Sequence, residues 1–370
     1  MENKIRAFLS LVSGGLWERG VYLKGFGELS FEDIYQLATE QSVLGLVTAG
    51  LEHVKDVKVP QTDILTFIGS SLQIEQCNLS MNRFIEKLMI RFRARDIYSI
   101  LVKGQGVAQC YEKPLWRSSG DIDLLMSEDS LSKALSFLEA LVKEVEKDQF
   151  GFIHYSMTID GWGLELHGTL RGGLGRKIDN VIDEVQADTM NLGSVRAWMN
   201  GEIDVYLPAP NNDVVFIFTH ILQHFFRGGI GLRQICDWCR LLWTYRDSID
   251  RSLLERRLKA MQLMSEWQAF AALAVDWLGM PVEAMPLYSG EKKWTEKALK
   301  IIAFIMETGN FGQNRDASYY SKYPRLVSKA ISLWQKTKDG VRQMMIFPKD
   351  ALRTWILRFG VGVRIAINGR

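Results

Sequence analysis

Two neighbouring stretches decide the fold: Leu101-Val-Lys-Gly-Gln-Gly-Val107 and, after a short connection, Arg117-Ser-Ser-Gly-Asp-Ile-Asp-Leu-Leu-Met126. In the second stretch, Asp121 and Asp123 stand two residues apart within an apolar run. Side chains at positions i and i+2 of a strand project from the same face, so the two carboxylates would share a small volume. Each like charge raises the pKa of the other unless a cation neutralises both. The pattern therefore favours Mg²⁺, a hard cation held by carboxylates together with substrate phosphates.

The surrounding segment alternates between strand and helix patterns. The predicted strands are residues 98–102, 122–126, 154–160 and 163–170. The last two strands are joined through Gly161-Trp-Gly, a hairpin signal, and residues 130–142 have helical periodicity. We expect an α+β fold in which a mixed sheet is flanked by amino-terminal and carboxyl-terminal helical regions.

A third carboxylate lies on the second strand of this hairpin. Glu165 and His167 alternate with leucines, so the polar pair points to one face of the strand and the leucines to the other. If Glu165 faces the same crevice as Asp121 and Asp123, three carboxylates converge there. Glu165 would then complete a metal shell or take the proton from an attacking hydroxyl. His167 either orients Glu165, satisfies a backbone carbonyl or contacts substrate.

The length of 370 residues allows two cores of ordinary size, or one core with helical extensions. Apolar residues recur at helical spacing over about residues 31–54, after the capping-box pattern Ser30-Phe-Glu-Asp, and again over 63–96. We predict an amino-terminal helical region at residues 1–96, an α/β core at 97–207 and a carboxyl-terminal helical region at 208–370.

The overall composition is that of a soluble globular protein, with 47% apolar and 24% charged residues. The net charge of +2 demands no acidic partner. No uninterrupted apolar run reaches the roughly 18 residues of a membrane span, and no signal-peptide cleavage site is evident. We expect a cytoplasmic protein. The pair Cys236-Asp-Trp-Cys239 matches a metal or redox spacing, but it lies in a helical pattern without a second ligand pair, which favours two buried helix residues.

Two histidines follow at helical spacing. His220 and His224 lie four residues apart, on one helix face, without the intervening glutamate of a metalloprotease helix. We predict that they line a nucleotide or acceptor cleft, while zinc binding and core packing stay open as alternatives. Asp237 is expected to pair with Arg233, four residues earlier on the same helix.

Three features bear on partners. The loops Arg171-Gly-Gly-Leu-Gly and Arg227-Gly-Gly-Ile-Gly are single copies of an RNA-binding pattern, and flexible turns at a cleft are the favoured interpretation. Because no stripe interleaves basic and aromatic residues, nucleic acid is not the expected acceptor. Between Lys322 and Arg370, eleven basic residues face only Asp339 and Asp350. This segment is either a solvated basic helix packed on the body or an amphipathic surface that weakly contacts anionic lipid or a partner.

Together, Lys103-Gly104, the run from Arg117 to Leu125, and Leu164-Glu-Leu-His167 resemble the bacterial uncharacterised nucleotidyltransferase family of the DNA polymerase β-like superfamily. That superfamily places a glycine-containing turn before a helix, an Asp-x-Asp on the next strand and a third acidic residue on a later strand. The resemblance is strongest over about residues 97–170, and the helical flanks agree in layout. One departure is the turn, which is Lys103-Gly-Gln-Gly where the superfamily has Gly-Gly or Gly-Ser.

The resemblance implies that Asp121, Asp123 and Glu165 are the catalytic, metal-binding carboxylates. It places Lys103, Gly104 and Arg117 near the triphosphate, and we add the three histidines His167, His220 and His224 as candidate nucleotide contacts. The implied reaction uses Mg²⁺, or alternatively Mn²⁺, to transfer a nucleoside monophosphate from an NTP such as ATP to an unidentified acceptor, with release of pyrophosphate. Such chemistry depends on positioning and charge neutralisation rather than a covalent nucleophile. A catalytically silent nucleotide-sensing or scaffold protein with the same fold is the alternative.

Overall fold

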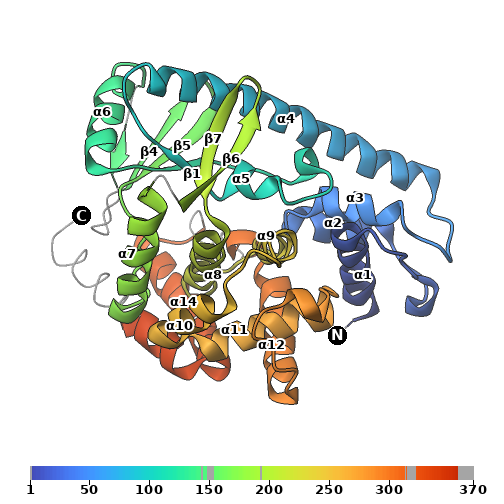
Figure 1. Cartoon of the computed structure of the whole chain (residues 1–370). Coiled ribbons are helices and arrows are strands. Elements are labelled where there is room, and N and C mark those ends of the chain that lie inside the picture. Colours follow the sequence, from blue (N-terminus) through green and yellow to red (C-terminus); the bar gives the residue numbers. More distant parts are fainter. Residues whose placement is uncertain are drawn as a thin grey trace.

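The computed structural model describes residues 2–142, 145–147, 154–191, 194–312, 314 and 322–356. It confirms the α+β fold, with a five-stranded mixed sheet, a separate two-stranded sheet and helices on both sides. In Figure 1 the long helix α4 (Gln61–Arg93) runs above the sheets, and the carboxyl-terminal helices lie below them. The boundaries of the three predicted regions stay a prediction.

The five-stranded sheet positions the acidic residues. Its strands are β1 (Ile100–Val102), β2 (Ile122–Leu125), β3 (Glu146–Lys147), β4 (His154–Ile159) and β5 (Trp162–His167). They lie in the order β1-β2-β5-β4-β3, and only β2 and β5 run parallel to each other. The predicted hairpin is present, but its turn is Asp160-Gly161, because Trp162 and Gly163 of the predicted Gly161-Trp-Gly connection already belong to β5. The φ angles of Asp160 and Gly161, 51° and 85°, suit a two-residue turn of the kind that matches strand twist.

A second hairpin was not predicted from the sequence. Strands β6 (Val195–Asn200) and β7 (Ile203–Pro208) pair antiparallel and form their own sheet. The intervening Gly201 has a φ of 62°, a conformation that glycine adopts without strain.

The amino-terminal part consists of helices. They are α1 (Asn3–Trp17), the 3₁₀ turn η1 (Lys24–Phe26), α2 (Phe31–Glu40), α3 (Leu44–Leu51) and α4. The Ser30 hydroxyl caps α2 by accepting a hydrogen bond from the backbone N–H of Asp33. A single helix over residues 31–54 is wrong, because Ser42 adopts a left-handed φ of 55° that ends the helical path between α2 and α3.

The remaining helices connect the strands or follow the second hairpin. They are α5 (Gly104–Ala108), η2 (Pro114–Trp116), α6 (Glu128–Leu138), α7 (Arg176–Met190), α8 (Pro210–Arg227), α9 (Leu232–Thr244), α10 (Arg251–Met261), α11 (Met264–Ala272), the π-helical η4 (Leu273–Trp277), η5 (Val282–Ala284), α12 (Lys292–Thr308), η6 (Asn310–Gly312) and α14 (Arg325–Ile346). Residues 348–356 are also helical.

The two faces of the sheet have different environments. Leucines from β1, β2 and β5 point into one apolar cluster with α4 and α6, as Leu124 and Leu166 illustrate. Asp123, Glu165 and His167 occupy the alternate positions of the same strands and therefore project from the other face. The alternation predicted for β5 is confirmed. Because α8 and α9 lie below that face in Figure 1, the polar side chains are turned toward the helices.

The packing of α1 on α3 depends on glycine. A methyl group at Gly15 would lie 2.0 Å from the backbone carbonyl oxygen of Leu46, and one at Gly50 would lie 2.0 Å from that of Leu11. Real side chains do not approach backbone so closely. The two helices can therefore meet only while both positions lack a side chain.

Other sequence expectations have clear outcomes. Cys236 and Cys239 are both fully buried on α9, as the favoured interpretation predicted, and burial raises the pKa of each thiol. No helix in the described part of the chain is both long enough and apolar enough to cross a membrane. The basic carboxyl-terminal segment is described as far as residue 356. Within it, the side chain of Trp334 is 71% exposed. Its contact with a membrane surface or partner stays a prediction.

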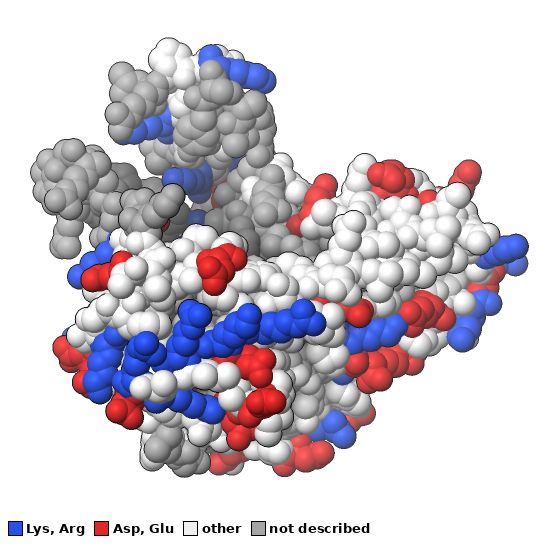
Figure 2. All heavy atoms as spheres, turned by 90° about the horizontal axis from the view of Figure 1, so that it is seen from above, with Lys and Arg blue, Asp and Glu red and all other residues white. Residues whose placement is uncertain are grey.

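Charges of both signs share the surface that carries α4. Figure 2 looks down on the top of Figure 1 and shows lysine and arginine side chains in a band, with acidic side chains beside it. On α4 itself, Arg83, Lys87 and Arg91 are exposed and follow one another at four-residue spacing. The mixture of signs agrees with the nearly neutral total charge.

Candidate active site

The strand order brings three carboxylates together. In the parallel pair of β2 and β5, Asp123 lies directly opposite Glu165, and Asp121 comes just before β2 on the same side as Asp123. Each of the three offers a carboxylate oxygen, and these oxygens all lie within 4.8 Å of one another. Asp123 is buried, whereas Asp121 is the most exposed member. The structure thus brings the three predicted carboxylates together, and their binding of a metal ion stays a prediction.

A strained turn places a lysine on this cluster. Lys103 follows β1 with a φ of 61°, and Gly104 has a φ of 45°, so the chain reverses sharply before α5. The Lys103 ammonium lies 2.7 Å from Oδ1 of Asp123. Burial works against its charge, but the Asp123 carboxylate more than compensates and raises the pKa of Lys103. Lys103 therefore remains a cation inside the cluster.

The three carboxylates carry more negative charge than the Lys103 ammonium neutralises, which favours binding of a further cation. Burial raises the pKa of Asp121, and the negative charges of Asp123 and Glu165 raise it further. Burial also disfavours the charge on Glu165, but hydrogen bonds from His154 and His167 hold the pKa of that carboxyl below its usual range. One ammonium faces three carboxylates, whose oxygens are the ligand type that Mg²⁺ prefers. The donor set therefore fits a divalent metal ion.

Two histidines extend the cluster along the sheet. Nε2 of His167 lies 2.8 Å from Oδ1 of Asp123 and 3.5 Å from Oε2 of Glu165. Of the three roles considered for His167, the structure shows the contact that orienting Glu165 requires. Nε2 of His154, a residue that the sequence reasoning missed, lies 3.1 Å from the same Glu165 oxygen. Its signal was available, because pairing outward from the Asp160-Gly161 turn sets residue 154 opposite residue 167.

Helix α8 forms the opposite wall. Nε2 of His220 lies 3.3 Å from the Lys103 ammonium and 3.1 Å from Nε2 of His224. Burial and the nearby Lys103 charge lower the pKa of both imidazoles, that of His224 to about 4. Both are therefore neutral at pH 7. The structure brings them to the cleft as predicted, and their contact with a nucleotide stays a prediction.

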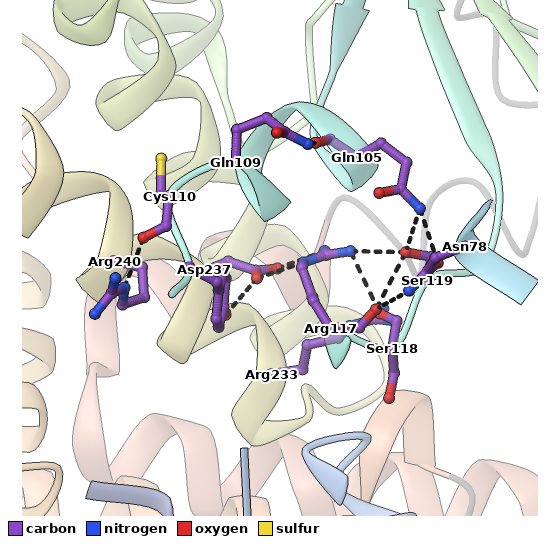
Figure 3. Close-up of polar contacts among 11 residues, drawn as sticks. Asn78, Gln105, Gln109, Cys110, Arg117, Ser118, Ser119, Arg233, Asp237 and Arg240 are labelled. Carbon is purple, nitrogen blue, oxygen red and sulfur yellow. Dashed lines mark hydrogen bonds and ion pairs between the residues drawn. The ribbon is translucent and has the colours of Figure 1, made fainter. Parts of the chain in front are cut away.

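Arg117 is held by a buried carboxylate on α9. Its Nε and Nη2 donate to Oδ1 and Oδ2 of Asp237, each at 2.7 Å, and the Tyr111 hydroxyl donates to the same Oδ1. Figure 3 shows the guanidinium between Asp237 and the loop residues Ser118 and Ser119. Burial opposes the charge of Arg117, but Asp237 raises its pKa above the ordinary value. A direct contact between Arg117 and triphosphate stays a prediction.

The expected partnership of Asp237 with Arg233 is wrong. Arg117 binds the carboxylate side-on, through Nε and Nη2, and Arg233 instead donates to the backbone carbonyl of Ser118 at 2.9 Å. The buried Nε of Arg233 has no hydrogen-bond partner among the described residues. The bidentate ion pair between Arg117 and Asp237 thus forms in place of the expected pair between residues four apart on α9.

The three carboxylates, Lys103, the four histidines described above, Arg117, Arg233 and Asp237 border one cleft. Its volume is about 470 Å³, and four of the chain's five histidines line it. The two glycine-rich loops reach it as expected, since Arg171 and Arg227 both belong to the lining. A guanidinium nitrogen of Arg227 donates to the carbonyl of Gly172 and so joins the two loops. The cleft therefore has an acidic floor on the sheet. Its helical side carries basic and neutral groups together with Asp237, whose charge is paired with that of Arg117.

The mixed sheet, with a carboxylate pair on one strand and a third carboxylate on the parallel neighbour, defines a nucleotidyltransferase-type fold. Comparison with known families agrees: the model of the uncharacterised nucleotidyltransferase family matches residues 27–279. The chain belongs to that family. No curated protein and no solved structure matches it.

Proposed function

We propose that the protein is a Mg²⁺-dependent nucleotidyltransferase that moves a nucleoside monophosphate from an NTP to an acceptor hydroxyl, amine or phosphate. An acceptor atom forms a bond to the α-phosphorus, the bond to the bridging oxygen of the β-phosphate breaks, and pyrophosphate leaves. The acceptor loses its proton, if it carries one, to a base or to water. The observation that carries the proposal is the convergence of Asp121, Asp123 and Glu165 at the floor of a cleft of nucleotide size.

The metal-binding part rests on the chemistry of the donor set. Asp121, Asp123 and Glu165 would hold Mg²⁺, or alternatively Mn²⁺, since all three offer carboxylate oxygens within a shared small volume. When bound, such ions supply charge neutralisation at the attacking and leaving oxygens of an in-line displacement.

The chain's own cations would orient the triphosphate. The Lys103 ammonium is buried at the carboxylates and stays protonated, so it can contact a phosphate oxygen that enters beside them. Arg227 and Arg233 come from the helical wall, and Arg233 keeps a buried Nε donor without a partner in the described structure. We propose that this wall receives the phosphates, because the sheet side of the cleft is acidic.

Neutral groups between these charges would position the rest of the substrates. His220 and His224 are uncharged at pH 7 and offer ring nitrogens to the cleft. Arg117 holds the loop before Asp121 against α9 through Asp237. In this role Arg117 positions the loop that leads into β2, and so positions Asp121. This role does not depend on a contact between its Nη1 and a phosphate.

The acceptor and the base are best found together. Purified protein would be incubated with each α-³²P-labelled NTP, Mg²⁺ and a cell extract, and the labelled product would be isolated. The D121N/D123N variant should lose labelling, whereas D129N should keep it, because Asp129 is an exposed residue on α6. Unchanged labelling by D121N/D123N would contradict the proposal. Mg-NTP binding without transfer to any acceptor would support the nucleotide-sensing or scaffold alternative. Cytoplasmic location is part of the same proposal and would be checked by cell fractionation.

A further inference from the structure

A second set of ligand atoms lies beside the carboxylate trio and shares one member with it. His154, Glu165 and His167 each offer one ligand atom, and these atoms lie within 4.8 Å of one another. Two of the three are nitrogens, so this set differs in chemistry from the all-oxygen set of Asp121, Asp123 and Glu165. The function proposed above does not use His154.

The hairpin of β4 and β5 builds this second set. His154 and His167 are directly opposite each other across the antiparallel pair. Their rings stack with centroids 4.6 Å apart and planes inclined by 8°. Both Nε2 atoms approach the same oxygen of Glu165, at 3.1 Å from His154 and 3.5 Å from His167. Cross-strand pairing thus fixes two imidazoles and a carboxylate around one point.

Imidazole nitrogen selects a different class of ion from carboxylate oxygen. Carboxylates suit Mg²⁺ and Mn²⁺, whereas imidazole suits zinc and its transition-metal neighbours. Two histidines and a glutamate are the protein ligands of several catalytic zinc centres, in which a further position stays open. We propose that His154, Glu165 and His167 form a second metal site, which binds a borderline transition-metal ion such as Zn²⁺ next to the carboxylate site.

The ion pairs in the cleft allow a cation to bind at this second site. The Lys103 ammonium sits on Asp123, whereas in the described part of the chain Glu165 forms ion pairs only with the two histidines. An ion at this site would therefore not have to displace the ammonium. About a quarter of the side-chain surface of His154 and of Glu165 is exposed, 25% and 26%, which leaves access from the cleft. His167 also contacts Asp123, so occupancy of one site would influence the other.

The two sets can be separated experimentally because they share only Glu165. Asp123 and His167 contact each other, so the discriminating ligand of each set is the one outside that contact. Asp121 belongs only to the oxygen set, and His154 belongs only to the nitrogen set. The experiment titrates metal-free protein, without a histidine tag and without nucleotide, with Co²⁺, whose visible absorption is intense with nitrogen ligands at low coordination number and weak in an octahedral oxygen shell. The variants are H154Q and D121N. The control is H53Q, because His53 is the one histidine outside the cleft.

Wild type should give an intense band that Zn²⁺ abolishes and Mg²⁺ does not. H154Q should lose the band and weaken Co²⁺ binding at least about 100-fold, because even partners one shell away from a metal contribute about 10- to 100-fold. D121N and H53Q should keep the band. Absence of an intense band in wild type, or an unchanged band in H154Q, would overturn the proposal. So would equal loss in D121N and H154Q, since that result defines a single carboxylate site.

A measurement on the wild-type protein covers the case in which H154Q misfolds. Diethyl pyrocarbonate modifies accessible imidazoles, and peptide mass spectrometry locates the products. Zn²⁺ should protect His154 at least about tenfold and leave His53 unprotected, because a metal-bound nitrogen cannot react. Equal modification of His154 with and without Zn²⁺ would refute the site. Neither readout involves an NTP, so failure here is distinguishable from failure of the proposed transferase activity.

Discussion

Replacing Asp237 by asparagine should destabilise the fold strongly, because it leaves a buried guanidinium without its counter-charge. The side chains of Arg117 and Asp237 are only 5% and 9% exposed, and two N–O contacts of 2.7 Å join them. Asparagine retains one acceptor oxygen and turns an NH₂ group toward the arginine. Removing one partner of a buried pair costs about 3–5 kcal/mol. We expect a loss of that size in the free energy of unfolding of D237N.

The assay is urea unfolding followed by tryptophan fluorescence, since Trp238 is fully buried next to Asp237 on α9. The matched control is E52Q, which breaks the Lys113–Glu52 pair. That pair has a similar N–O distance of 2.6 Å, but its side chains are 37% and 50% exposed. Its loss should cost less than about 1 kcal/mol.

A double substitution sharpens the test. R117M/D237L removes both charges, so its cost should be clearly smaller than the sum of the R117M and D237L costs. If D237N loses no more stability than E52Q, or if the double substitution is simply additive, the buried pair does not organise this loop.

Two further predictions concern parts of the fold away from the cleft. Burial and the neighbouring Asp350 carboxylate raise the pKa of Glu266 to about 8 from its usual 4.5, so the folded state keeps a proton that the unfolded chain releases. The protonated Glu266 carboxyl therefore stabilises the folded state fully below pH 4.5, and this stabilisation is lost as pH rises through about 8. The loss amounts to at most on the order of 5 kcal/mol. E266Q should flatten the curve of unfolding free energy against pH, and parallel curves for E266Q and wild type would refute the assignment. G15A should lower the melting temperature and cost at least about 1–3 kcal/mol, because its methyl group would overlap the Leu46 carbonyl. The exposed Gly69, where a methyl group meets nothing within 4 Å, is the control, and equal melting temperatures of G15A and G69A would contradict the packing argument.

Much of the core fold could be predicted because its signals are local. The i, i+2 spacing of Asp121 and Asp123 and the alternation around Glu165 fixed the faces of β2 and β5 without any three-dimensional information. The hairpin of β4 and β5 followed from its turn. The hairpin of β6 and β7 carried a comparable signal in Asn200-Gly201, which the sequence reasoning did not use.

The features that escaped prediction depend on contacts between distant segments. Nothing in the sequence specifies that β2 pairs with β5 rather than β4, because strand order is set by packing of the whole sheet. The pairing of Arg117 with Asp237 spans 120 residues, whereas the local pattern offered Arg233 at helical spacing. His154 is a local exception: it was overlooked because the register of the hairpin, which sets residue 154 opposite residue 167, was not followed outward from the turn.

Mg²⁺-dependent release of pyrophosphate, measured for wild type and E165Q under single-turnover conditions with the acceptor found by labelling, tests the central claim most directly. Glu165 is the member of the carboxylate group that lies on a separate strand, β5, and the sequence predicted that it joins Asp121 and Asp123. Loss of a metal-holding group removes several kcal/mol of charge stabilisation, so E165Q should release pyrophosphate at least about 1,000-fold more slowly, while D129N matches wild type. A rate for E165Q within about tenfold of wild type would show that the three carboxylates do not act together as the catalytic centre.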